Sequence, residues 1–481
     1  MSDKSIAFAR ANKALVRLGI PGILPKLRGA GLQISRLTLG GSHSVVTYPP
    51  LKALRTVTSI EGINVPKYGR TTNLYVHIVP CESKCPFCHY DVMLWKGLRT
   101  QAKVGRYMEA LTWDLDFWAE QLRRTGTAIS SLYIGGGTPL VLEEADLVNL
   151  VRFIREKFNL LPDAEICVEG SPLTITAEEG PQKLRALKRE GVTRFSFGIQ
   201  SFDNRVLQEA GRGYGREIAV GACAYVREVF DNWNVDLIQS LSSGTPDEVW
   251  DNLQVLETIR PPHITWYHGR FDPDRPQGRR RADPKTQRDF EGEQDTFLGR
   301  MLIWQQLRKM GYRQVDGNRF VLDERYVDPF KNTRLAGTND LLGIGASAYS
   351  RVTGETCGLF FRNLPENKGG QYVARIEEGR VPIGTALEID LAEQLATSYV
   401  AGLRTGRIET EADGLARQRY PALSEHYYRL VGQLLNLGVL VQTERDGAVV
   451  LRLSLLGQLL EDEVLALFYS PSVMAALADP G

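Results

Sequence analysis

The alternation of short β-rich runs with longer helical stretches constrains the fold of this chain most strongly. Between about residues 71 and 270, runs rich in β-branched and aromatic residues alternate with stretches whose apolar residues recur three or four positions apart. Such alternation predicts strands connected by helices. The predicted strands are 73–79, 131–134, 165–169, 194–199, 234–238 and 263–267. Six such units in succession predict an α/β fold with a parallel sheet, either doubly wound or curled into a barrel, with chemistry at the carboxyl ends of the strands.

The segments outside this region predict further domains, because 481 residues exceed one ordinary hydrophobic core. Residues 1–70 carry one amphipathic helical pattern, at 5–18, and are predicted to form an N-terminal extension. Residues 271–384 are predicted to form a connector and a barrel-completing segment, beginning with a highly charged and exposed stretch that ends near 292. Residues 385–481 combine helical patterns with a small hairpin pattern, which predicts a winged-helix-like α+β domain.

Composition limits the partners of the protein. Fifty-eight basic and 57 acidic residues give a net charge of +1, which argues against a general nucleic-acid or membrane surface and favours a small-molecule partner. The N-terminus lacks the apolar core of a signal peptide, and no run of about 18 apolar residues occurs, so we expect a cytoplasmic protein without a membrane span. Six cysteines are too few for a disulfide scaffold, and three of them lie close together.

The clustered cysteines indicate a metal site. Cys81, Cys85 and Cys88 form a C-x3-C-x2-C run that directly follows the first predicted strand. Three thiolates in one short loop can bind three irons of a 4Fe-4S cluster. The fourth iron would then have no nearby protein ligand, and it could be chelated by the amino and carboxylate groups of a small molecule. The loop therefore predicts a catalytic cluster.

Zinc is the main alternative for this loop. His77 or His89 could complete a Cys3His set around one zinc ion, although the spacing differs from that of common zinc modules. The remaining cysteines stand singly among apolar or small residues and are predicted to be inert core residues; they are Cys167, Cys223 and Cys357.

Glycines and polar residues follow the later predicted strands at the same edge. The triplet 135–137 ends the second strand and lets a ligand approach the backbone, while it lacks the spacing of a phosphate-binding loop. Glu169, Gln200 and Asp236 end the next three strands, and Arg212 follows in a turn. Together these groups suit the hydroxyls, carboxylate and ammonium of an aminoacyl nucleoside.

At these residues the chain resembles the radical S-adenosylmethionine (SAM) superfamily, and in particular the group typified by oxygen-independent coproporphyrinogen III oxidase. The matching motifs, within about residues 71–470, are LYVHI, C-x3-C-x-F-C, GGGTP, EICVEGSP, FSFGIQSF, AGRGYG, NVDLI and DLLGIGASAYS. The resemblance implies a partial (β/α)6 barrel over residues 71–270, a C-terminal domain, a 4Fe-4S cluster and an external one-electron reductant of flavodoxin or ferredoxin type.

The resemblance also implies two SAM molecules and assigns residues to each. Those matching the first SAM site, beside the cluster, are Tyr75, Gly136, Glu169 and Tyr349, of which Tyr349 differs in side-chain type from the family pattern. Those matching the second SAM site are Phe87, Gly137, Thr138, Gln200, Arg212 and Asp236. No catalytic residue is implied beyond these contacts.

One departure from the oxidase bears on the expected reaction. The oxidase has a further cysteine two residues after the third cluster cysteine, where this chain has Tyr90. In this respect the chain resembles the haem chaperones and class C methylases of the family, and the chaperones usually lack a long N-terminal extension. We therefore expect transfer of a methyl or methylene group from the second SAM to an unsaturated carbon of a natural product or tetrapyrrole, giving C-methylation or cyclopropanation. Porphyrinogen decarboxylation, haem delivery and a zinc-stabilised interaction protein are the alternatives.

Overall fold

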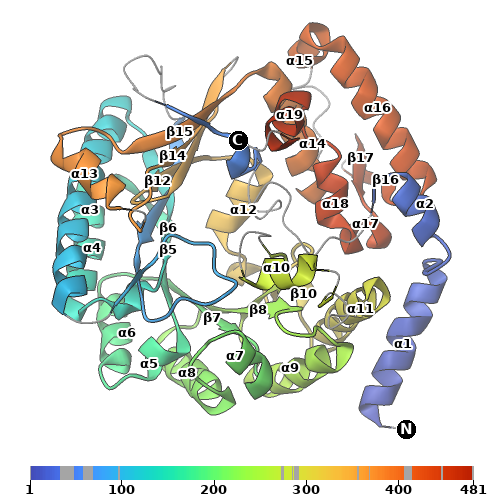
Figure 1. Ribbon diagram of the computed structural model, residues 1–481, viewed down its shortest axis with the longest axis horizontal. Helices are drawn as coiled ribbons and strands as arrows, with labels where there is room; N and C mark the ends of the chain where they lie inside the picture. The colour runs from blue at the N-terminus through green and yellow to red at the C-terminus, as the bar shows by residue number, and fades with distance from the viewer. Residues whose placement is uncertain are drawn as a thin grey trace.

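The computed structural model describes residues 2–32, 48–57, 69–95, 98–271, 276–283, 285–286, 292–354, 357–367, 369–405, 414–445 and 448–478. The six predicted strands form the centre of one sheet (Figure 1). They are β2 (Thr71–Ile78), β5 (Ala128–Gly136), β6 (Leu160–Gly170), β7 (Arg194–Gln200), β8 (Trp233–Gln239) and β9 (His263–His268). Each is parallel to the next in this order, which confirms the predicted α/β class.

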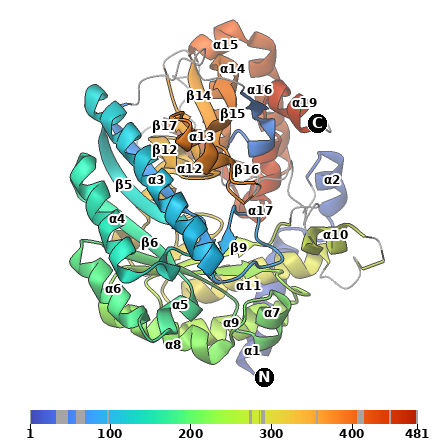
Figure 2. The ribbon, with the colours of Figure 1, turned by 60° about the vertical axis from the view of Figure 1, so that its left-hand side comes forward.

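Helices between these strands cover the outer face of the sheet (Figure 2). They are α3 (Leu98–Thr125), α4 (Glu144–Lys157), α5 (Pro172–Thr176), α6 (Gly180–Arg189), α7 (Asn204–Glu209), α8 (Arg216–Val229) and α9 (Pro246–Ile259). In α4, Leu147, Leu150, Val151 and Ile154 are buried at helical spacing, so one stripe packs on the sheet while the opposite face meets solvent. The carboxyl ends of the strands are thereby left open to loops.

The sheet extends beyond the predicted strands at both edges. Next to β2 lies β12 (Asp340–Ile344), also parallel, followed by antiparallel β13 (Tyr349–Val352), β14 (Gly358–Asn363), β15 (Ile383–Ile389) and β1 (Arg55–Thr56). Next to β9 lie β11 (Arg319–Val321) and β10 (Arg313–Gln314). The end strands β1 and β10 are separated by all the others in the strand order, so the sheet forms an open, partial barrel.

A short helix, α12 (Pro329–Ala336), lies inside this curved sheet rather than on its outer face (Figure 1). The Asp328 side chain caps its N-terminus by accepting from the Lys331 amide, and Gly337 ends it with φ of 66°. Phe330 stacks on Tyr133 of β5 with ring centroids 5.0 Å apart. The helix therefore brings its own side chains into the barrel.

The N-terminal helix was predicted at 5–18 and is α1 (Asp3–Arg17). Ala7, Ala11 and Leu15 are buried on one stripe, which packs against α11 (Glu293–Lys309). The remaining elements before residue 390 are α2 (Leu24–Gly29), η2 (Leu51–Ala53), β3 (Pro80–Cys81), β4 (Met93–Leu94), η3 (Pro139–Val141), α10 (Pro276–Ala282), η5 (Glu324–Tyr326) and α13 (Gln371–Glu377).

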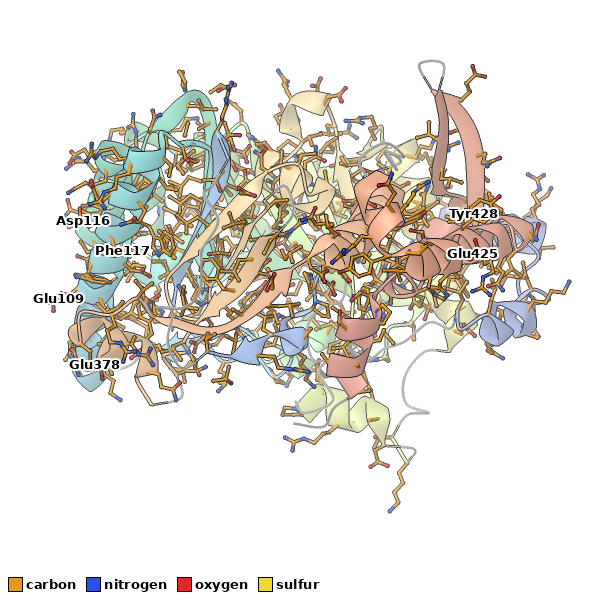
Figure 3. The ribbon with its side chains drawn as sticks, turned by 90° about the horizontal axis from the view of Figure 1, so that it is seen from above. Glu109, Asp116, Phe117, Glu378, Glu425 and Tyr428 are labelled. Atoms are coloured by element: carbon orange, nitrogen blue, oxygen red, sulfur yellow. The ribbon has the colours of Figure 1, made fainter. Side chains whose placement is uncertain are left out.

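The segment after residue 385 contains helices and a hairpin, as predicted. These elements are α14 (Leu391–Thr405), α15 (Gly414–Arg419), α16 (Pro421–Asn436), β16 (Leu440–Arg445), β17 (Ala448–Leu453), α17 (Leu455–Leu459), α18 (Glu461–Ala466) and α19 (Pro471–Ala478). Figure 3 shows α3, with Glu109, Asp116 and Phe117, at the opposite end of the molecule from α16, with Glu425 and Tyr428. The exact domain boundaries stay predictions.

Two expectations about exposure were wrong. Within the charged stretch, Arg281 on α10 is buried, because its guanidinium donates to the carbonyls of Ser240 and Ser242. Cys357, expected in the core, is exposed at the start of β14, whereas Cys167 and Cys223 are buried as predicted. Among the described helices, none has both the length and the hydropathy required to cross a bilayer.

Candidate functional site

The cysteine loop leaves the carboxyl end of β2, where the sheet is open. Cys85 is buried, Cys81 and Cys88 are half-buried, and the Cys88 amide donates to the Cys85 carbonyl over 3.0 Å to form a tight turn. The Cys81 Sγ atom lies 3.3 Å from Thr138 Oγ1, and Arg212 Nη1 donates to the Cys85 Sγ atom over 3.2 Å. Thr138, just after β5, and Arg212, in the turn after α7, therefore contact the thiols.

The glycine triplet braces this loop. The Gly137 amide donates to the Ile78 carbonyl over 2.7 Å, and the Thr138 amide donates to the Pro80 carbonyl over 2.8 Å. A Cβ atom on Gly137 would lie 2.3 Å from the Pro80 oxygen, and one on Gly136, which has φ of 113°, would lie 2.5 Å from the His77 ring. Only glycine permits this approach, so the motif fixes the backbone of the cluster loop.

The protonation of Cys81 depends on its surroundings. Burial, assisted by the negative charge of Glu82, raises the pKa of the Cys81 thiol to about 11. A thiolate is the form that binds iron, so the positive charge of the metal must lower this pKa on binding. The donor set is chemically suited to an iron-sulfur cluster, since thiolates are its usual ligands.

The zinc alternative fits the geometry less well. A closed zinc site needs four ligands around one ion, whereas a cubane takes each thiolate on a different iron. In the part of the chain that the structure describes, no three His, Cys, Asp or Glu side chains converge on one metal position. His77 is already engaged, with its Nε2 atom 2.8 Å from the Asp91 carbonyl and its Nδ1 atom 3.1 Å from the Tyr75 hydroxyl.

Aromatic rings and one carboxyl group lie beside the loop, inside the barrel. Tyr75 and Tyr133 stack at 6.3 Å between centroids, and Phe330 adds to the same cluster from α12. Glu169 accepts hydrogen bonds from the Tyr133 hydroxyl over 2.5 Å and from the Gly136 amide over 3.2 Å. Burial raises the pKa of the Glu169 carboxyl, and nearby Asp236 acts in the same direction.

Gln200 ends β7, as predicted, whereas Asp236 lies within the neighbouring β8, three residues before its end. Gln200 has a left-handed backbone with φ of 73°, and its Oε1 atom is buried without a hydrogen-bond partner among the described residues. Strained backbone of this kind in a non-glycine residue is concentrated at binding sites. Asp236 accepts from Asn234 Nδ2 over 2.8 Å and lies 3.9 Å from the Lys331 ammonium.

Arg212 and Phe87 have contacts that the sequence did not predict. Besides Cys85, the Arg212 guanidinium donates to the Tyr214 hydroxyl over 2.9 Å and to the Gly198 carbonyl over 2.9 Å, so each of its nitrogens is engaged. Phe87 packs in an apolar cluster with Val206, Ala210, Leu241 and Phe271. Contacts of both residues with a second SAM stay a prediction.

Sequence reasoning missed the functional groups on α12. Lys331 is buried against Asp236, with its ammonium 5.8 Å from the centre of the Tyr133 ring. Arg334 Nη1 donates to the Tyr349 hydroxyl over 3.1 Å. The Asp-Pro pair at 328–329 signals a helix start, but two cations one turn apart are usually solvent-exposed, so nothing in the local sequence places them inside the barrel.

Comparison with known proteins agrees with this geometry. Residues 75–256 match the family model of the radical SAM superfamily. Over 88% of the chain, the fold superposes with a TM-score of 0.71 and 22% identity on 96% of coproporphyrinogen III oxidase (HemN) from Escherichia coli. Residues 75–256 are thus similar to the radical SAM superfamily, whose members carry a 4Fe-4S cluster and SAM, and the fold is a partial barrel with an added C-terminal domain.

Two kinds of curated protein within this superfamily are similar to the chain. The heme chaperone HemW of Escherichia coli (strain K12) is 29% identical over 283 residues, which are 58% of this chain and 70% of the relative. The oxygen-independent coproporphyrinogen III oxidase of the same strain is 29% identical over 324 residues, covering 64% of this chain and 66% of the relative. The chain is therefore related to the coproporphyrinogen oxidase-like proteins, as its motifs predicted.

The expected transfer of a methyl or methylene group is wrong, and the assignment to a methylase or cyclopropanase branch has no support. Relatives matched over more than half of the chain include haem chaperones and a coproporphyrinogen oxidase. The expectation rested on Tyr90 and on the length of the N-terminal extension, and neither specifies the group that a radical site transfers. Tyr90 in place of cysteine is equally compatible with a chaperone.

Proposed function

We propose that the barrel binds a propionate-bearing tetrapyrrole and that the protein oxidatively decarboxylates a propionate side chain. The reaction converts the ring-bound CH2–CH2–COO− group into a vinyl group and CO2, with release of one proton and two electrons. The hydrogen atom leaves with one of these electrons to the SAM-derived radical, and an external one-electron acceptor takes the other. The relatedness to coproporphyrinogen III oxidase supports this reaction class.

The aromatic cluster between the sheet and α12 is the observation that carries the proposal. Tyr75, Tyr133 and Phe330 form one aromatic cluster, with centroid separations between 5.0 and 6.3 Å, and Tyr75 lies on β2, the strand that leads into the cysteine loop. A macrocycle of pyrrole rings can pack on such a surface with a large buried apolar area. Lys331, near the Tyr133 ring, adds a positive charge for an anionic ligand.

The residues proposed to hold the cofactors follow from the site. Cys81, Cys85 and Cys88 would hold the cluster, and the cluster with SAM supplies a 5′-deoxyadenosyl radical when bound. Tyr75, Gly136, Glu169 and Tyr349 would contact the first SAM. The Glu169 carboxylate and the Gly136 backbone would orient its ammonium group.

We further propose a second SAM contacting Phe87, Gly137, Thr138, Gln200, Arg212 and Asp236. The buried and unpaired Oε1 atom of Gln200 supports a ligand in this position, since such atoms normally have partners. A flavodoxin- or ferredoxin-type protein would deliver the activating electron to the cluster.

Haem delivery is a second candidate, favoured by one specific observation. Tyr90 stands where the oxidase has an additional cysteine, and relatives with 26–29% identity are named heme chaperones. Haem also carries two propionates, so the same aromatic surface and cationic groups would suit it. The two candidates differ in whether the bound tetrapyrrole is changed.

Anaerobic assays with the reconstituted full chain separate them. The protein would be incubated with SAM, dithionite and coproporphyrinogen III, and in parallel with haem. Loss of about 46 mass units (CO2 and two hydrogen atoms) from coproporphyrinogen for each propionate, in step with 5′-deoxyadenosine formation, is the result we expect. Stoichiometric haem binding with unchanged coproporphyrinogen would replace the oxidase proposal with haem delivery.

A further inference from the structure

Two arginines from different elements adjoin Tyr349. Arg334 of α12 donates from Nη1 to the Tyr349 hydroxyl over 3.1 Å. Arg362 of β14 is the direct register partner of Tyr349 across the antiparallel β13–β14 pair. Directly opposed residues of antiparallel strands project from the same face of the sheet. Two arginines from different elements therefore adjoin the same tyrosine.

Neither arginine forms an ion pair with a carboxylate in the described parts of the chain. The Nε atom of Arg334 is buried and has no hydrogen-bond partner among these residues. Arg362 donates its Nε to the Ser347 carbonyl over 3.1 Å. Both arginines are half-buried, and a guanidinium that loses part of its hydration without an ion pair is stabilised by binding an anion. Both side chains retain donors for an anionic ligand.

Both arginines lie near residues that flank the cysteine loop. Tyr90, two residues after Cys88, is close enough to Arg334 to influence its guanidinium electrostatically. Arg362 is likewise close enough to His77 to influence its imidazole electrostatically. The His77 ring lies beside that of Tyr75, and its centroid is 6.4 Å from that of Tyr90. An anion held by the pair would thus lie beside the radical chemistry.

We propose that Arg334 and Arg362 form a receptor for carboxylates of the substrate, each arginine binding one propionate of the tetrapyrrole. This receptor rests on the proposed function and specifies which substrate groups the chamber recognises. A guanidinium can bind a carboxylate through two parallel hydrogen bonds, which fixes direction as well as charge. The Tyr349 hydroxyl orients Arg334, so that one propionate is anchored while another faces the cluster.

The test measures binding rather than turnover. Coproporphyrin III, the stable oxidised form, and its tetramethyl ester would be titrated by fluorescence into the cluster-loaded full chain without reductant. Arg334→Gln and Arg362→Gln should each weaken binding of the acid by roughly 10- to 100-fold, the range of a charge-assisted hydrogen bond, while affinity for the ester stays unchanged. Arg334→Lys should recover part of the loss, because it keeps the charge without the bidentate geometry.

Controls distinguish this effect from misfolding and from SAM binding. Arg429→Gln, on the exposed face of α16, should bind coproporphyrin as the unaltered protein does. Iron content and SAM affinity are measured for every variant. Tight porphyrin binding that neither glutamine variant weakens overturns the receptor and leaves the proposed function standing. A loss confined to SAM affinity also overturns it, because the arginines would then hold the methionine carboxylate. Failure of the unaltered protein to bind coproporphyrin overturns the proposed function and the receptor together.

Discussion

Arg212 donates a hydrogen bond from its Nη1 atom to the Sγ atom of Cys85 over 3.2 Å, and both side chains are buried. A cationic donor on a thiolate that binds iron stabilises the more negative, reduced cluster, because hydrogen bonds to sulfur and burial set the potential of such clusters. Arg212 therefore acts on the electron-accepting step in addition to any contact that it makes with SAM.

Arg212→Gln should lower the midpoint potential of the cluster by roughly 50–100 mV, since part of a charge-assisted hydrogen bond is lost and 59 mV corresponds to a tenfold change for one electron. Iron content should not change. A redox titration followed by electron paramagnetic resonance measures the shift. Arg205→Gln, on exposed α7, is the control, and an equal potential in both variants would show that the contact with Cys85 has no electronic role.

Alanine at any one of Cys81, Cys85 and Cys88 should remove the 4Fe-4S cluster, because each thiolate is proposed to bind a different iron. The brown absorbance and the content of about four irons and four sulfides, measured after anaerobic reconstitution, should be lost together. Cys223→Ala, in the core of α8, should retain both. One zinc ion without labile sulfide in the unaltered protein would refute the cluster assignment.

Gly137→Ala should impair cluster assembly without removing a ligand. The added Cβ would lie 2.3 Å from the Pro80 carbonyl oxygen, so the loop that carries Cys81 must move. Gly105→Ala provides a matched control, because its Cβ would meet no atom within 4 Å and its helical position favours alanine. Iron content and melting temperature are the measurements. Equal iron content in the two variants would contradict the bracing role of the glycine turn.

Asp236→Asn should weaken SAM binding by roughly 10- to 150-fold while the cluster remains, since a charged acceptor for ribose hydroxyls or ammonium is lost on β8, away from the cysteines. Equilibrium dialysis of SAM against the cluster-loaded protein measures the change. Asp231→Asn, exposed before β8, serves as the control. Unchanged affinity would mean that Asp236 serves the Asn234 and Lys331 contacts alone.

The central strands and the cysteine loop could be predicted because their signals are local. Each run has its own period, and the position of Cys81 directly after β2 follows from adjacency in the sequence. In contrast, β13 to β15 are antiparallel, and β1 joins them from residues 55–56, so no local period indicates how they pair with the parallel strands. Fold class and cluster site were therefore accessible, and the full extent of the sheet was not.

The polar interior was harder to predict for a different reason. Lys331 and Arg334 have the composition of an exposed helix, and only the placement of α12 inside the curved sheet turns them inward. Arg212 was identified as a site residue, but its contact with Cys85 requires the turn after α7 to approach the cysteine loop. Residue type indicated chemistry here, whereas tertiary packing decided which group each side chain meets.

Asp114 of α3 gives the fold a specific dependence on pH. Its Oδ2 atom accepts from the Tyr372 hydroxyl over 2.7 Å and from the Gly345 amide over 3.3 Å, yet burial raises the pKa of the carboxyl from its ordinary 3.8 to about 6. The folded state therefore binds a proton more tightly than the unfolded state. The resulting stability is fully present below pH 4 and is lost as the pH rises through about 6.

Asp114→Asn should remove this dependence, because the amide does not ionise. The free energy of unfolding of the unaltered protein relative to the variant should fall by about 3 kcal/mol between pH 4 and pH 7, given about 1.4 kcal/mol for each pKa unit. Urea denaturation of both proteins at each pH measures the difference, in which all other carboxyl groups cancel. Tyr372→Phe should raise the pKa of Asp114 further, because it removes a donor that stabilises the carboxylate. The loss of stability should then extend to higher pH. A constant difference across this range would show that Asp114 ionises in the folded protein as it does in the unfolded chain.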